Sequence, residues 1–195
     1  MIPTIDDILV NIIRDRLMFL KNNIHFIDEI FSSASDDLRN QLKHYLTTQN
    51  IKVVKNYPRD QAQLPAYAVL LGSEEESVES LGNYLEDAGD GAELYGTMFK
   101  SRYRIETWST NADLTVGLFL ILKWIFLDAR DALIKQGLLL QHLGAADLEP
   151  LPNFPDFPYR RALLFETTSE AWVTRTYETI SEVVDESEFR IRGEH

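Results

Sequence analysis

The chain has no cysteine, which excludes disulfide bonds, zinc sites built on thiolates and cysteine nucleophiles. Basic residues are few: 19 lysines and arginines stand against 31 aspartates and glutamates, and the net charge is -12. Binding to DNA through its phosphates needs clustered lysine and arginine, so this balance predicts repulsion of DNA. The nine glycines form neither a dinucleotide-binding nor a phosphate-binding loop.

No apolar run is long enough to predict a membrane span. The longest, residues 114–127, has about 14 residues where a span needs ~20, contains Lys123 and is followed by Asp128. The N-terminus lacks a positively charged segment that leads into an apolar one, so we expect no secretory signal and synthesis in the cytosol.

Motifs for catalysis or metal binding are also missing. His25, His44, His142 and His195 lie far apart, and none has a second ligand at helical spacing. The acidic residues 87–91 do not match a calcium-binding loop. We therefore expect no enzymatic activity, no cofactor and no metal. An enzyme that uses aspartate or glutamate for general acid and base catalysis would need a pocket that no motif indicates.

What the sequence does contain is organised around residues 99–137. Residues 99–108 alternate between apolar and polar, which predicts a strand, and residues 109–111 offer the side-chain oxygens of a helix start. A helix is then expected over residues 114–136, with Gly137 as its stop. Its first half, residues 114–127, is apolar on nearly every side, so we expect it to be covered on two or more sides.

Before this stretch, apolar residues at 3–4 spacing predict a helix that begins near Thr4 and either continues past residues 22–23 or breaks there. A further helix is predicted to begin at Ser35. Strands are expected at residues 51–57, 66–71, 159–165 and 172–180, the last two either as a hairpin around residues 167–170 or as one kinked strand.

Together these elements predict an α+β fold in a single domain over residues 1–195. We expect a mixed, mainly antiparallel sheet, packed on one face by the long central helix and the N-terminal helices. Three segments lie outside this framework: an acidic protruding loop at 73–93, a proline-rich arm at 150–158 and a polar C-terminal tail at 185–195.

The acidic segment combines like charges with glycines and has no basic residue, so we expect a long mobile hairpin or loop. It is either a solvated loop, a weak cation site, or a surface that faces passing DNA or a basic partner. Its eight acidic residues are Glu74, Glu75, Glu76, Glu79, Glu86, Asp87, Asp90 and Glu93.

An all-round apolar helix in a chain of this size favours an oligomer, because the sheet and two N-terminal helices can cover only some of its sides. Aromatic side chains on and before this helix belong to a core, a ligand pocket or a subunit interface. Our candidate interface residues are Leu118, Phe119, Leu122, Trp124 and Trp108. In the proline-rich arm, Phe154 and Phe157 are candidate anchors for a partner.

In the order of its elements, the chain resembles the tail-terminator and neck proteins of tailed bacteriophages. The resemblance rests on N-terminal amphipathic helices, strands at 51–57 and 64–71, an acidic protruding loop, a strand at 103–108, the long helix from Leu114, and the two closing strands. It covers most of the chain as an arrangement of elements.

The resemblance implies a structural virion protein that forms a ring, commonly of six subunits, which caps the tail tube and joins it to the head connector. Its partners would be copies of itself and tail tube, sheath or connector proteins, with DNA passing through an acidic bore without specific binding. It would be assembled in the host cytoplasm and reside in the tail or neck of the virion, with no membrane contact. A competing interpretation is an acidic binding or adaptor module that neutralises a basic protein partner through residues 74–93. Oligomeric state distinguishes the two.

Overall fold

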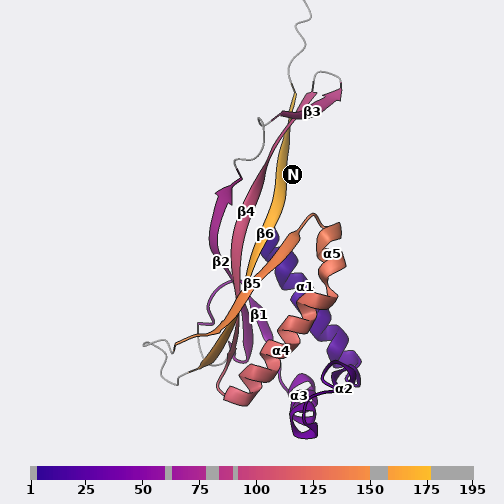
Figure 1. Ribbon diagram of the computed structural model, residues 1–195, viewed down its shortest axis with the longest axis vertical. Helices are drawn as coiled ribbons and strands as arrows, with labels where there is room; N and C mark the ends of the chain where they lie inside the picture. The colour runs from indigo at the N-terminus through magenta and orange to yellow at the C-terminus, as the bar shows by residue number, and fades with distance from the viewer. Residues whose placement is uncertain (1–3, 60–62, 78–83, 90–91, 150–157, 177–195) are drawn as a thin grey trace, which may run out of the picture.

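The protein is one layer of helices packed on one face of a long, twisted sheet (Figure 1). The computed structural model describes residues 4–59, 63–77, 84–89, 92–149 and 158–176, and for residues 84–94 and 175–176 it describes the backbone alone. The α+β class, with a mixed and mostly antiparallel sheet under the helices, confirms the prediction from sequence.

The N-terminal helices follow the predicted pattern. Helix α1 (Ile5–Asn22) begins after Thr4, although the Thr4 side chain does not cap it, and the chain breaks at Asn23 before the short helix α2 (Phe26–Ile30). Helix α3 (Asp36–Thr48) begins as predicted at Ser35, whose hydroxyl accepts a hydrogen bond from the Leu38 amide at 3.3 Å.

The central stretch contains two helices where the sequence predicted one. Strand β4 (Ala92–Ser109) leads to Asn111, whose side chain caps helix α4 (Ala112–Asp128) by accepting from the Leu114 amide at 2.9 Å. The helix breaks at Ala129, and α5 (Arg130–Lys135) continues in a new direction before Gly137, at φ +78°, ends it. The glycine stop was predicted, whereas the break at Ala129 has no glycine or proline to mark it.

The other strands are β1 (Lys52–Val54), β2 (Ala66–Glu76), β3 (Tyr84–Gly89), β5 (Leu139–Asp147) and β6 (Tyr159–Thr176). Their order in the sheet is β1-β2-β4-β6-β5, and β3 pairs with the first residues of β4. β1 and β2 are parallel, and all other pairs are antiparallel.

Of the two alternatives for the segment after Tyr159, the single strand is confirmed and the hairpin is wrong, and Thr167 and Ser169 are buried within that strand. Two other strand predictions need correction. β1 is shorter than predicted, because the chain leaves the sheet at Lys55 and then places the Tyr57 ring against the Trp108 ring. The acidic segment is mainly extended strand where it is described, shared among the ends of β2, β3 and β4.

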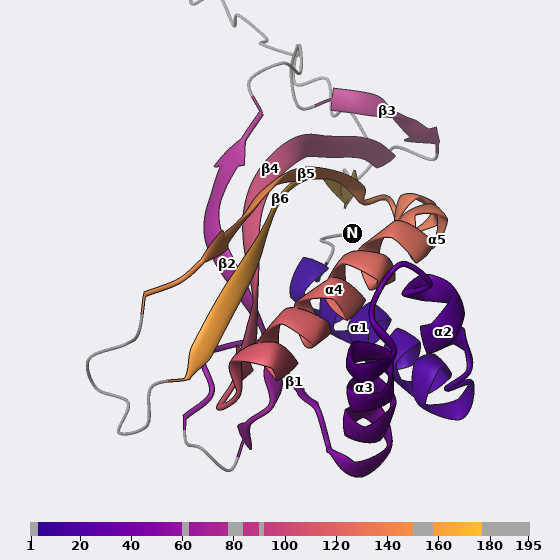
Figure 2. The same ribbon diagram turned by 60° about the horizontal axis from the view of Figure 1, so that its bottom comes forward.

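The main core lies between the sheet and the helices (Figure 2). Helix α4 packs on β4 and β6 with one side and on α1 and α3 with the other, which explains why its sequence is apolar all round. Gly117 permits the close approach of α3, because a Cβ there would lie 2.3 Å from Leu42 Cδ2. Tyr67 ties β2 to α4 through a 2.7 Å hydrogen bond to the Leu118 carbonyl.

Strands β4 and β6 extend far beyond the helical layer and form an arm (Figure 1). Each has 18 residues, and they pair along their full length from Ala92–Thr176 to Ser109–Tyr159. At about 3.3 Å per residue, such strands are roughly 60 Å long, about three times the length of a typical strand.

Candidate functional site

The sheet face opposite the helices carries a network of charged and aromatic side chains around a buried glutamate. We call it the Glu106 network: Tyr57, Arg104, Glu106, Trp108 and Arg160. Alternation along β4 places Arg104, Glu106 and Trp108 on this face, and the β4–β6 register sets Arg160 opposite Trp108. Tyr57 reaches the same face from the segment that leaves β1, and its ring meets the Trp108 ring edge-on at 5.8 Å.

Glu106 is the centre of this network. Its carboxylate is fully buried and forms ion pairs with Arg104 Nε at 2.7 Å and with Arg160 Nη1 at 3.4 Å. Burial raises the pKa of Glu106, while the two guanidinium groups and a hydrogen bond with Trp108 oppose that rise. A buried carboxylate held by two arginines fixes the positions of the strands and loops that carry them.

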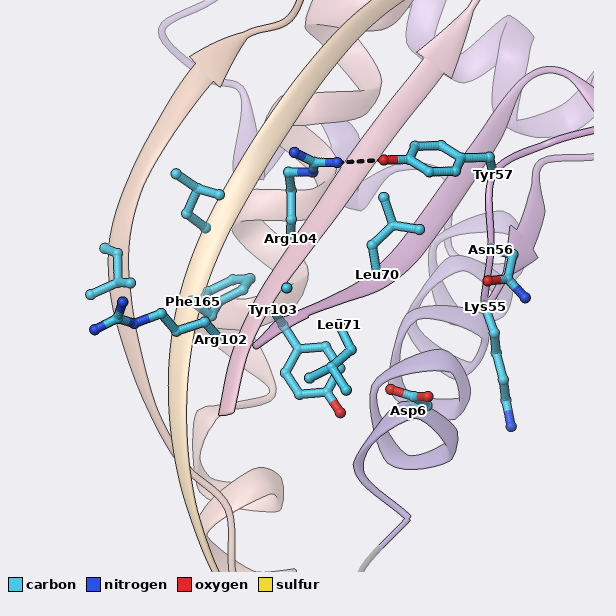
Figure 3. A pocket seen from close by; sticks show the side chains of 13 residues that line it. Asp6, Lys55, Asn56, Tyr57, Leu70, Leu71, Arg102, Tyr103, Arg104 and Phe165 are labelled. Carbon is cyan, nitrogen blue, oxygen red and sulfur yellow. Dashed lines mark hydrogen bonds between the residues drawn. The ribbon is translucent and has the colours of Figure 1, made fainter. Parts of the chain in front are cut away.

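Arg160 and Arg104 connect the network to the two chain segments that cross this face. The Arg160 guanidinium lies 4.8 Å above the Trp108 ring and donates to the Glu149 carbonyl, while the Leu148 amide donates to the Arg160 carbonyl at 3.1 Å. Arg104 donates to the Tyr57 hydroxyl at 2.5 Å (Figure 3). Arg160 follows the proline-rich segment and Glu149 precedes it, so the network holds both ends of that segment. Phe154 and Phe157 lie outside the described residues.

Beside this network is a hollow of about 720 Å³, which runs from the segment after β1 across β2, β4 and β6 to Leu143 of β5 (Figure 3). Lys55, Tyr57, Arg102 and Arg104 line it together with apolar side chains such as Leu70. The segment from Lys55 to Tyr57 forms one wall of the hollow, because β1 pairs with β2 only up to Val54–Ala68 and the chain then turns away.

The N-terminus of α1 closes the lower side of this hollow. Burial raises the pKa of Tyr103, and a hydrogen bond with the Asp6 carboxylate acts in the same direction. Asp7, the next residue of α1, forms an ion pair with Lys55 at 2.5 Å, which joins the helix to the segment that leaves β1.

The predicted interface residues are placed mainly inside the subunit. Leu118, Leu122 and Trp108 are fully buried and Phe119 is 4% exposed, so the single subunit accounts for their burial. Trp124 is half-buried, and its ring stacks on Phe19 at 6.5 Å. A direct role of these five residues in subunit contacts stays a prediction.

The acidic residues fall into described and undescribed parts. Glu74 accepts a hydrogen bond from the Ser101 hydroxyl at 2.8 Å, and Glu76 accepts one from Thr97 at 2.7 Å. Glu75 faces Lys100 across the β2–β4 pair. Glu86, Asp87 and Glu93 lie on β3 and β4 with undescribed side chains, and Glu79 and Asp90 lie outside the described residues.

Within the described ranges, no group of three or more histidine, aspartate or glutamate side chains is arranged to hold a metal ion. None of the helices in that part of the chain is long and apolar enough to cross a membrane. The Glu106 network escaped the sequence analysis because its two charged halves are 54 residues apart and meet only through the strand register. The one local signal was a glutamate between apolar residues of a predicted strand.

Comparison with known proteins identifies the family. A family model described as phage termination protein matches residues 1–93 and 84–194, which is nearly the whole chain. A search of curated proteins finds no match. The family consists of structural, non-enzymatic phage tail terminators, in agreement with the resemblance in the order of elements and with the interpretation as a virion protein that interacts with other tail proteins. The chain therefore belongs to the phage termination protein family.

Proposed function

We propose that this terminator acts as a ring of six subunits, which caps the tail tube, joins it to the head connector and leaves a channel for DNA. The observation that carries this proposal is the presence of two different open edges on one sheet. An interface between two unlike surfaces repeats from copy to copy and closes into a ring when the rotation permits, whereas like surfaces give dimers.

The first open edge is β5. Its outer side pairs with no strand among the described residues, and residues 139–146 contain no lysine, arginine or proline to discourage pairing. A bulge between His142 and Gly144 interrupts its register with β6. Leu139 is 63% exposed and Leu143 is 48% exposed, so the edge offers apolar side chains to a neighbour.

The second open edge is the part of β2 beyond Ala68. β1 covers only residues 66–68, and from Val69 to Glu76 the outer side of β2 meets no other described strand. Since no described strand pairs on this side, the backbone N–H and C=O groups of residues 69–76 can accept an added strand. We propose that β5 of one subunit pairs here with β2 of the next.

Charge supports the channel part of the proposal. A net charge of -12 opposes lasting contacts with the phosphate backbone, so DNA would pass a bore formed by these subunits without sticking. We assign Glu74, Glu75 and Glu76 on β2, with the acids of residues 79–93, to the bore or to a basic tail protein. The segment with Phe154 and Phe157, held at both ends by the Glu106 network, would contact the protein above or below the ring.

The mass of the purified protein in solution, followed by imaging of the assemblies, tests the ring. The variant Leu139→Lys places a charge on the exposed β5 edge, where it costs the subunit little, and we expect it to remove rings while the fold persists. Asn40→Lys is the control, because Asn40 is exposed on α3, a helix that packs on α1, α2 and α4. Monomers of the unaltered chain that bind a basic partner would instead favour the acidic adaptor.

A further inference from the structure

A second hollow, of about 400 Å³, lies between helices α4 and α5 and the outer strands β5 and β6. We call it the α4–β5 groove. Its floor consists of four buried side chains, Phe126, Leu133, Leu163 and Phe165, and the rings of Phe126 and Phe165 lie 4.6 Å apart. The floor is thus rigid and apolar.

The rim of the α4–β5 groove is cationic. Lys123 and Arg130 line it with exposed cationic side chains, and the exposed His142 lies at the same rim. No described carboxylate forms an ion pair with Lys123 or Arg130. Leu127 stands at the same rim with 75% of its surface exposed. In a chain with a net charge of -12, an apolar floor with a cationic rim calls for an occupant that is both apolar and acidic.

Residues 177–188 of the same sequence have that chemistry. They contain five acidic residues and no basic one. Tyr177, Ile180, Val183 and Val184 recur at 3–4 spacing, which would bring them to one side of a helix. Residues 189–195 differ, because Phe189 and Ile191 alternate with arginines that the cationic rim would repel.

Chain length decides which copy supplies this segment. β6 ends at Thr176, nine residues past Thr167, which pairs with Leu140 of the groove wall, and nine strand residues span roughly 30 Å. As a helix, in which the apolar side chains would share one side, residues 177–184 would span only about 12 Å and would not reach the groove of their own subunit. A groove on another copy is the one that this segment could fill.

We propose that the α4–β5 groove binds residues 177–188 of a second copy of this chain. The apolar side chains would cover the groove floor, and the carboxylates would meet Lys123 and Arg130. This inference rests on the proposed ring, because β5 forms both the outer edge that meets a neighbour and one wall of the groove. The groove contact would in turn strengthen the ring.

Cross-linking tests the contact in the full-length protein, because the chain has no cysteine of its own. One chain carries Leu127→Cys at the rim, and a second, with a distinguishable tag, carries Val184→Cys. We expect mild oxidation of the mixture to form a disulfide between the two chains. The double substitution Lys123→Glu and Arg130→Glu on the first chain should lower the yield about tenfold, by loss of attraction and gain of repulsion. The double substitution Lys21→Glu and Lys135→Glu, at the ends of α1 and α5, makes the same charge change outside the groove and should leave the yield unchanged.

The mass of each mixture is measured as well, because the mass reports ring formation and the disulfide reports the groove contact. The two measurements separate this inference from the proposed function. Rings without a cross-link between chains would overturn the groove contact and leave the ring standing. A further chain carries both Leu127→Cys and Val184→Cys. If a disulfide forms only within that chain, a subunit binds its own tail, which contradicts the length argument. A cross-link between chains without rings would support the contact and contradict the ring.

Discussion

Removal of the Glu106 carboxylate is expected to destabilise the subunit strongly. Glu106 is fully buried, and the Arg160 side chain opposite it is only 7% exposed, so Glu106→Leu leaves a guanidinium in the sheet layer without its counter-charge. Breaking a buried pair in this way costs about 3–5 kcal/mol of the free energy of unfolding. Arg104 adds little to that cost, because its side chain is 38% exposed and turns to solvent.

Two matched variants show whether the buried charge is the cause. Glu106→Leu combined with Arg160→Met replaces both charges by apolar groups, and we expect this double variant to be more stable than Glu106→Leu alone and within about 1–2 kcal/mol of the unaltered chain. Arg160→Met alone leaves Glu106 paired with Arg104 at 2.7 Å, so its cost should be smaller, about 1.5–3 kcal/mol.

Chemical denaturation of the four proteins gives these free energies in one double-mutant cycle. The reasoning fails if Glu106→Leu costs less than about 1 kcal/mol, or if the double variant is no more stable than the single one. Either result would mean that Arg160 finds water or another partner once Glu106 is gone.

Three further predictions concern the helices and the buried tyrosines. Gly117→Ala should lower the free energy of unfolding by about 1–3 kcal/mol, because the new methyl group meets the buried Leu42 side chain at 2.3 Å; equal stability in a denaturation curve would contradict this packing. Asn111→Ala should cost about 1 kcal/mol through loss of the α4 cap, and Asn111→Ser should recover most of it. Burial raises the pKa of Tyr67 and Tyr103, so their contribution to stability is complete below about pH 10 and declines as the pH rises further. Ultraviolet absorbance of tyrosinate should show these two residues ionising only with unfolding, and ionisation together with the exposed tyrosines would refute their burial.

The fold class was predictable because periodicity and capping are local signals. The helix starts at Ser35 and Asn111 and the helix stop at Gly137 were all visible in the sequence. β5 was missed, since its second half, residues 144–146, is one glycine and two alanines, which have low strand propensity.

The candidate sites were harder to predict, because they depend on long-range pairing. Glu106 and Arg160 meet only through the register of two strands, and the gap beside β2 exists only because β1 stops at Val54. The predicted interface side chains on α4 are mostly core, since α1 and α3 together cover the side that the sequence analysis reserved for a second subunit. An all-round apolar helix indicates burial and does not say which layer covers it.

A structure of the assembled ring by electron cryo-microscopy tests the central claim most directly. The account predicts six subunits around an open bore, with β5 of each subunit hydrogen-bonded to β2 of the next at residues 69–76. Closed dimers, or rings in which both sheet edges remain exposed to solvent, would contradict it.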